Sequence, residues 1–225
     1  MLVKTILIRL VTTAITLFGV AVVVFTLVRV APGNPSSMML PPGATEEDIA
    51  ALTKLYGFDK SIFEQFWIWF GGVIQGDFGT SITLRQPVDA LVLGRLPATL
   101  ELSIMALLIA LALGGFAAVI GARHRGTGTE FGLDLTSGAV LSIPDFLWGL
   151  VFVLLFGVLW PVLSISGRVD PNLDIDFTTN FYVLEGILRG RFDVVGSTLA
   201  HMIMPAMSLA LPLAAMIAQL LKQNL

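Results

Sequence analysis

Four long runs of residues without charged side chains dominate the pattern of hydrophobic and polar positions along this chain. They cover residues 10–28, 102–122, 146–167 and 194–221. At about 1.5 Å of rise per residue, an α-helix of such length crosses the roughly 30 Å hydrocarbon core of a bilayer. The pattern therefore predicts an all-α polytopic membrane protein with four spans.

Prolines lie inside the third and fourth of these predicted spans. The third helix is expected to begin near Leu135, because the residues from there to Pro144 are also apolar and only Asp145 interrupts the two halves. A proline removes a backbone donor and kinks a helix. We therefore expect broken helices at Pro144, Pro205 and Pro212, and these prolines are candidate hinges.

Two shorter helices are predicted between the first and second spans. Thr45 precedes three acidic residues and reads as an N-cap, and Gly57 is expected to end that helix. An aromatic helix follows from Ser61 to Gly71-Gly72, and its rings favour packing or interface anchoring over a ligand cage. The expected organisation is an N-terminal span at 1–30, a small helical extracytoplasmic insertion at 31–95, and a membrane domain with three spans at 96–225.

The basic residues predict the orientation of these spans. Lys4, Arg9, Arg123, Arg125 and Lys222 all fall on one side of the membrane if the N-terminus is cytoplasmic. Short cytoplasmic loops are enriched in Lys and Arg. The segments on the opposite side are then long and rich in acidic residues, and both termini are expected in the cytoplasm.

The composition excludes several kinds of chemistry. Hydrophobic residues make up 56% of the chain and charged residues only 13%, and there is no cysteine. Without a basic cluster, nucleic-acid binding is not expected, and without a phosphate-binding loop the chain is not expected to bind ATP. No nucleophile elbow accompanies its serines, so we expect no enzyme activity. His201 with Met202 and Met204 supplies too few donors for a metal site.

Asp145 is the most unusual residue of the predicted spans. An ionised Asp at the centre of a span costs roughly 2.5 to 3.5 kcal/mol, so it usually faces a wet cavity or a partner. The alternative is that the third helix simply begins near Pro144 and Asp145 lies at the membrane interface. We take Asp145, Ser142, Trp148 and Met207 as candidate residues of a substrate pathway.

Two short motifs lie before the second span. Gly76, Asp77, Gly79 and Ser81 belong to a segment typical of a tight, rigid turn, because the glycines allow positive φ and the carboxylate accepts from the amides that follow. Arg95 and Pro97 belong to the second motif, in which Pro97 is expected in the first turn of the second span. Both motifs are interpreted as structural.

Taken in order, these motifs resemble those of a known family. The matching segments are 29–35, 55–60, 65–67, 76–81 and 95–102. Together they are similar to the first of the two permease subunits in bacterial ABC importers for dipeptides, oligopeptides and nickel. The resemblance covers residues 1 to about 125 and implies the fold of a type I ABC importer permease.

The resemblance implies a permease subunit that forms half of a transmembrane pathway in the bacterial inner membrane. Its implied partners are a second homologous permease, two ATPase subunits that bind ATP and Mg, an extracytoplasmic substrate-binding protein and the lipid bilayer. The substrate stays open between peptides and related small solutes, because several importers share these motifs. A membrane scaffold that transports nothing is the alternative, and a secondary transporter fits poorly without an inverted repeat.

The chain departs from the family in one respect. The family carries a cytoplasmic ATPase-docking loop after the fourth of these spans, followed by two further helices. This sequence stops at Lys222-Gln223-Asn224-Leu225, where that loop is expected to begin. We therefore expect a sequence truncated before the docking loop.

Overall fold

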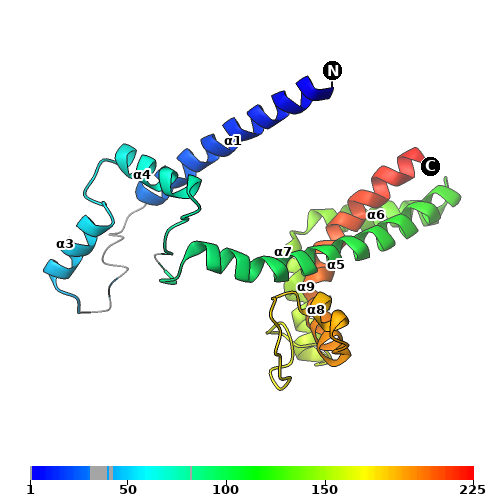
Figure 1. The fold of residues 1–225 in the computed structure, drawn as a ribbon. Coiled ribbons are helices and arrows are strands. Elements are labelled where there is room, and N and C mark those ends of the chain that lie inside the picture. The colour runs from blue at the N-terminus through cyan, green and yellow to red at the C-terminus, as the bar shows by residue number, and fades with distance from the viewer. Residues whose placement is uncertain (1, 31–39, 41–42, 82) are drawn as a thin grey trace. The chain divides into compact units, whose positions relative to one another are not determined.

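The computed structural model describes residues 2–30, 40, 43–81 and 83–225 (Figure 1), which divide into two compact units, Met1–Leu93 and Gly94–Leu225. Within the described residues the regular structure is helical apart from one isolated bridge between Thr80 and Pro87. The prediction of an all-α protein is confirmed.

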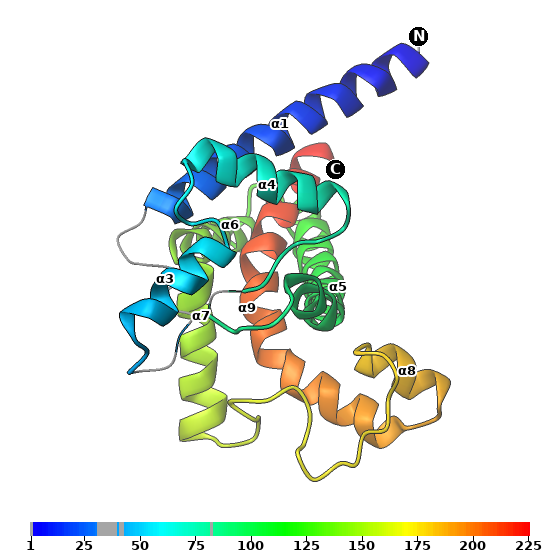
Figure 2. The ribbon, with the colours of Figure 1, turned by 60° about the vertical axis from the view of Figure 1, so that its left-hand side comes forward.

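The first unit is built from α1 (Leu2–Val30), α3 (Glu46–Leu55) and α4 (Ile62–Ile74). Phe18 and Phe25 of α1 contact Phe66 of α4, with ring centroids 5.7 and 5.4 Å apart. Figure 2 shows the two helices side by side. The aromatic residues therefore serve in helix packing, as predicted.

Both short helices of this unit begin with a capping box. Asp48 accepts from the backbone and hydroxyl of Thr45, while the Thr45 oxygen accepts from the Asp48 amide. Glu64 and Ser61 make the same reciprocal bonds. Hydrogen bonds from these hydroxyl groups lower the pKa of Asp48 and of Glu64. The predicted N-cap at Thr45 is confirmed, and Ser61 caps the helix that was predicted to start there. α4 runs on to Ile74, past the predicted end at Gly71-Gly72, because glycine only weakens a helix interior and need not end it.

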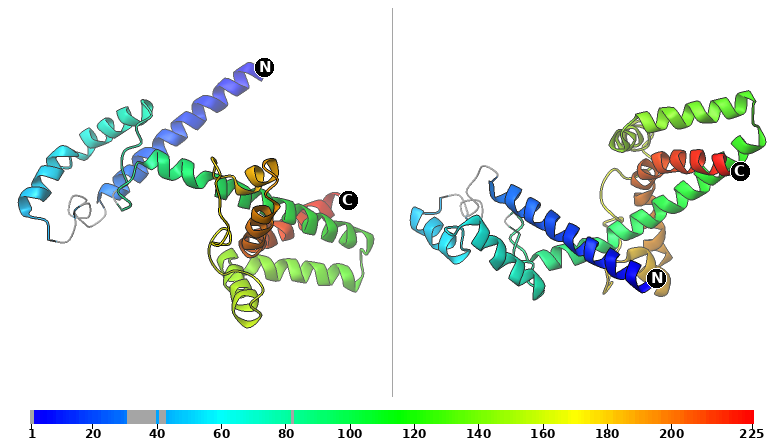
Figure 3. Two further views of the ribbon diagram at one scale, coloured as in Figure 1. Left: turned by 60° about the horizontal axis from the view of Figure 1, so that its bottom comes forward. Right: turned by 90° about the horizontal axis from the view of Figure 1, so that it is seen from above.

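The second unit holds the remaining helices, except that α5 begins a few residues before its boundary. They are α5 (Val88–Arg123), α6 (Gly128–Ser142), α7 (Asp145–Phe152), the π-helical η1 (Val153–Leu159), α8 (Tyr182–Leu188) and α9 (Phe192–Asn224). Figure 3 shows α6 alongside α9.

Three helices in the described residues, α1, α5 and α9, are long and apolar enough to cross a membrane. A fourth span results if α6 and the α7–η1 pair are counted together, although they bend by 97° at the break between them. The predicted break at Pro144 is thus present. α9 continues through Pro205 and Pro212 without an interruption, so these prolines do not divide the span, and Figure 2 shows α9 bent along its length. Their role as hinges stays a prediction.

The position of Pro97 also differs from the prediction. α5 begins at Val88, so Pro97 lies buried inside the helix and not in its first turn. A proline there removes one helical hydrogen bond. The motif that was expected to start the span instead lies within it, and residues 88–96 extend the helix beyond the apolar run.

Small residues form the core of the second unit. Ala106, Ala110, Gly114 and Ala118 recur every four residues on α5 and are buried against a matching series on α9, at Ala206, Ala210, Ala214 and Ala218. A Cβ added at Gly114 would lie 2.7 Å from the Ala214 carbonyl oxygen, and one at Gly121 would lie 3.0 Å from the Lys222 side chain. Since later residues of α5 meet later residues of α9, the helices run parallel, and small residues permit their close approach.

Candidate functional site

The break between α6 and α7 brings three of the predicted pathway residues together. Asp145 is the first residue of α7, and its exposed carboxylate accepts from the Phe146 amide at 2.9 Å. The Ser142 hydroxyl donates to the Gly138 carbonyl at 2.7 Å, and the Trp148 indole donates across the break to the Val140 carbonyl at 3.4 Å. The two donors therefore bind to backbone carbonyls of α6.

Met207, the fourth pathway residue, lies half-buried on α9, the helix that packs against α7. Its neighbour Ser208 approaches α7 closely, because a Cβ on Gly149 would lie 3.7 Å from the Ser208 hydroxyl. The structure therefore places Met207 on the helix beside the break.

The Asp145 carboxylate is the charged group at this break. Across the described residues, no Lys, Arg or His side chain lies within ion-pair distance of it. A carboxylate near apolar surroundings gains most from a cationic partner. The Asp145 carboxylate can therefore attract a cation without first breaking an ion pair within the described residues.

An ion pair between the buried Glu101 and the half-buried Arg168 ties α5 to the segment before α9. The Arg168 guanidinium donates to Glu101 at 2.7 Å and lies over the Tyr182 ring, 4.1 Å from its centroid. The other oxygen of Glu101 accepts from the amides of Val183 and Leu184. Sequence reasoning had placed Glu101 only in a structural motif and missed this partner, which lies 67 residues away.

A second carboxylate, Glu185, orders the same segment. It accepts four hydrogen bonds from the backbone amides and hydroxyls of Thr178 and Thr179, and it pairs with Arg189. Burial raises the pKa of Glu185, but these hydrogen bonds outweigh burial and lower the pKa to about 2. The lowered pKa stabilises the folded segment at pH values above 4.5, the pKa of the unfolded carboxyl group. This contribution is lost as the pH falls through the folded pKa of about 2.

A third charged cluster joins the first two turns of α6 to the C-terminal end of α9. The Lys222 ammonium pairs with Asp134 at 2.5 Å and with Glu130 at 3.2 Å, while Arg125 donates to the Lys222 carbonyl at 2.8 Å. Sequence reasoning used Lys222 and Arg125 for orientation only. Their positions show that they also fasten α9 to the α5–α6 turn.

The glycine motif before α5 forms the predicted tight turn. Gly76 and Gly79 have φ of 87° and 75°, and Asp77 accepts from the Gly79 amide at 2.8 Å. The Ser81 hydroxyl accepts from the Leu84 amide at 3.2 Å. Arg95, from the second motif, is exposed on α5.

The described residues contain no group of three or more His, Cys, Asp or Glu side chains placed to hold a metal ion. His201, the residue weighed for that role, has its Nδ1 atom 2.7 Å from the Ser197 carbonyl. This ring nitrogen therefore contacts the backbone one turn earlier in α9.

Comparison with known proteins shows what these helices are similar to. Residues 2–103 match the N-terminal region of the membrane components of binding-protein-dependent transport systems. The di/tripeptide transport system permease protein DppB of Pseudomonas aeruginosa (strain UCBPP-PA14) is 36% identical over 88% of this chain and 60% of its own length. The dipeptide permease DppB of Escherichia coli (strain K12) is 33% identical over 90% of the chain and 61% of its own length.

A more distant relative agrees with these two. The oligopeptide transport system permease protein AppB of Bacillus subtilis (strain 168) is 28% identical over 81% of the chain and 58% of its own length. The chain thus spans about 60% of the length of the curated relatives that it matches.

The fold is that of a polytopic, all-α membrane protein, and the relatives are named as permeases. The chain is similar to the membrane components of binding-protein-dependent transport systems, and among them to peptide permeases.

Proposed function

We propose that this chain contributes one half of the membrane pathway of an ATP-driven importer for dipeptides or short oligopeptides. The observation that carries the proposal is the agreement of the relatives, which are named as peptide permeases and match 81% to 90% of the chain. The break at Asp145 supports it, because a scaffold has no need of an unpaired carboxylate in a broken span.

The proposed partners are a second permease, an extracytoplasmic substrate-binding protein and two ATPase subunits that bind ATP and Mg and hydrolyse the nucleotide. This chain then needs no cofactor of its own and performs no covalent chemistry. The proposed location is the bacterial inner membrane. A cytoplasmic N-terminus places the cluster of Lys222, Glu130 and Asp134 on the inner side and the Glu101–Arg168 pair on the outer side.

In this proposal the α6–α7 break contributes to substrate passage. The Asp145 carboxylate attracts the ammonium group of a peptide, with Ser142, Trp148 and Met207 nearby on the pathway. Pro144, Pro205 and Pro212 permit two packings of the helices, and nucleotide binding by the ATPase subunits shifts the population between them. Gly76, Asp77, Gly79, Ser81, Arg95 and Pro97 keep a structural role.

The test is uptake of a labelled dipeptide by a host that lacks other peptide importers and expresses the complete transport system. Deleting the gene that encodes this chain should reduce uptake to background, and a plasmid copy should restore it. Membrane amounts of the other subunits are measured in parallel. Uptake that persists without the gene contradicts the proposal. Uptake that returns in the deletion strain when only the other subunits are overproduced also contradicts it, because the chain would then act as a scaffold.

A further inference from the structure

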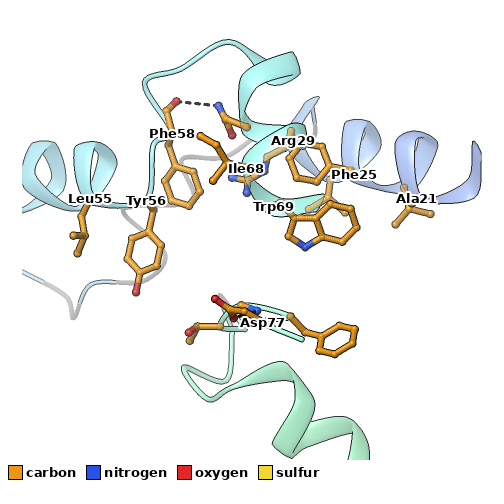
Figure 4. A pocket seen from close by; sticks show the side chains of 15 residues that line it. Ala21, Phe25, Arg29, Leu55, Tyr56, Phe58, Ile68, Trp69 and Asp77 are labelled. Carbon is orange, nitrogen blue, oxygen red and sulfur yellow. Dashed lines mark hydrogen bonds between the residues drawn. The ribbon is translucent and has the colours of Figure 1, made fainter. Parts of the chain in front are cut away.

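A cavity in the first unit has no role in the proposed pathway. It has a volume of about 570 Å³ and lies between the end of α1, the α3–α4 connection, α4 and the glycine turn (Figure 4). Its wall is mainly apolar and aromatic, including Val24, Tyr56 and Trp69, with Arg29 and Asp77 as its charged residues.

Arg29 is held in this wall without a polar partner for one of its nitrogens. Its guanidinium lies 4.6 Å from the Phe58 ring centroid and 5.1 Å from that of Phe25. The Nη1 atom is buried and, in the part of the chain that the structure describes, has no hydrogen-bond acceptor. Ring faces attract a cation but leave its N–H donors unsatisfied, so the site favours an oxyanion.

The cavity also carries a negative charge. Asp77 lies on the turn across the cavity from Arg29 in Figure 4. One oxygen of Asp77 accepts from the Gly79 amide, which leaves its second oxygen for another donor. A ligand with both an oxyanion and an ammonium group matches this pair of charges, whereas a purely anionic ligand would face repulsion from Asp77.

The position of the cavity along α1 indicates that the ligand comes from the membrane. Only 6% of the apolar stretch of α1 is buried by the described residues, so its apolar surface is available to lipid. Arg29 follows directly after the uncharged run of 10–28, where hydrocarbon gives way to headgroups. Ala21 and Val28 line the cavity from the same helix and continue its apolar surface.

We propose that this cavity binds a zwitterionic phospholipid that carries an ammonium headgroup. The phosphate accepts from Arg29, the ammonium donates to Asp77, and an acyl chain lies along α1 beside Ala21 and Val24. The bound lipid thereby fastens α1 to α4 and the glycine turn. This inference does not depend on which solute the transporter carries.

The test uses the complete transporter, purified in nanodiscs that contain a photoactivatable phosphatidylethanolamine, with mass spectrometry to map the labelled peptides. We expect labelling within residues 21–29 and 55–80. Arg29→Gln should reduce it about tenfold or more, because a charge-assisted hydrogen bond is lost, and Arg29→Lys should retain part of it. Arg85→Gln is the matched control, because Arg85 is exposed on the same unit and does not line the cavity.

A second variant tests the ammonium site and remains informative if Arg29→Gln does not assemble. Asp77→Asn keeps an acceptor for the Gly79 amide but removes the charge, so it should lower labelling by phosphatidylethanolamine relative to phosphatidylglycerol. Equal labelling in Arg29→Gln and Arg85→Gln overturns the proposal. So does an unchanged lipid preference in Asp77→Asn, full competition by soluble glycerophosphoethanolamine, or crosslinking of the cavity to another subunit.

Discussion

Replacing Gly114 by alanine should destabilise the transporter, because the added Cβ would lie 2.7 Å from the Ala214 carbonyl oxygen and 2.9 Å from the Ile217 side chain. One of these contacts is with backbone, so α5 and α9 must move apart. Overpacking of this kind costs about 1–3 kcal/mol. The measurement is the thermal unfolding midpoint of the purified complex, together with its abundance in the membrane.

Gly115→Ala is the matched control for this prediction. Gly115 is the next residue on the same helix, and a Cβ there meets nothing within 4 Å. Its substitution should change stability by less than about 0.5 kcal/mol, as at other sites free of close contacts. Equal midpoints for the two variants would show that α5 and α9 do not approach as closely as described.

Replacing Glu101 by alanine should release the segment between η1 and α8. The substitution leaves Arg168 without its counter-ion and the amides of Val183 and Leu184 without their acceptor. Removing one partner of a buried pair costs about 3–5 kcal/mol, and the partial exposure of Arg168 favours the lower end of that range. Hydrogen exchange of residues 168–184 in the assembled complex measures the effect.

The exposed pair of Arg191 and Asp193 supplies the control. Both side chains are more than a third exposed, so Asp193→Asn should cost less than about 1 kcal/mol. Exchange that rises equally in both variants would mean that the Glu101 pair does not hold this segment. An unchanged rate in Glu101→Ala would contradict the assignment directly.

Local patterns in the sequence were sufficient to predict much of the fold. The apolar runs predicted the spans because hydrocarbon thickness fixes their length, and Thr45 predicted a helix start because its hydroxyl caps nearby amides. The turn at Gly76 and Gly79 followed from their need for positive φ. These features depend on residues a few positions apart.

Proline positions were harder to interpret. The pattern placed Pro97 at a helix start and expected α9 to break at Pro205 and Pro212, but both helices continue through their prolines. Packing of a long span against its neighbours can offset one missing hydrogen bond, and this compensation is invisible in a local pattern. Pro144 differs because the helix does break there.

The charged clusters could not be predicted from the sequence. Glu101 and Arg168 are 67 residues apart, and Lys222 and Asp134 are 88 apart. A single sequence indicates which residues are charged, but pairing across such distances depends on how the helices pack. The cavity around Arg29 was missed for the same reason, since it brings α1 together with residues of α3, α4 and the turn.

The central claim is that the break between α6 and α7 lies on a pathway that opens to each side of the membrane in turn. The chain contains no cysteine, so Asp145→Cys introduces a single thiol into it. In the assembled transporter, we expect its reactivity toward an impermeant reagent to change by about fivefold or more between the nucleotide-free and ATP-bound states, and to fall when peptide-loaded binding protein is present. Thr129→Cys, at the start of α6, should react alike in every state. Reactivity at position 145 that is the same in both nucleotide states and insensitive to peptide would contradict the account.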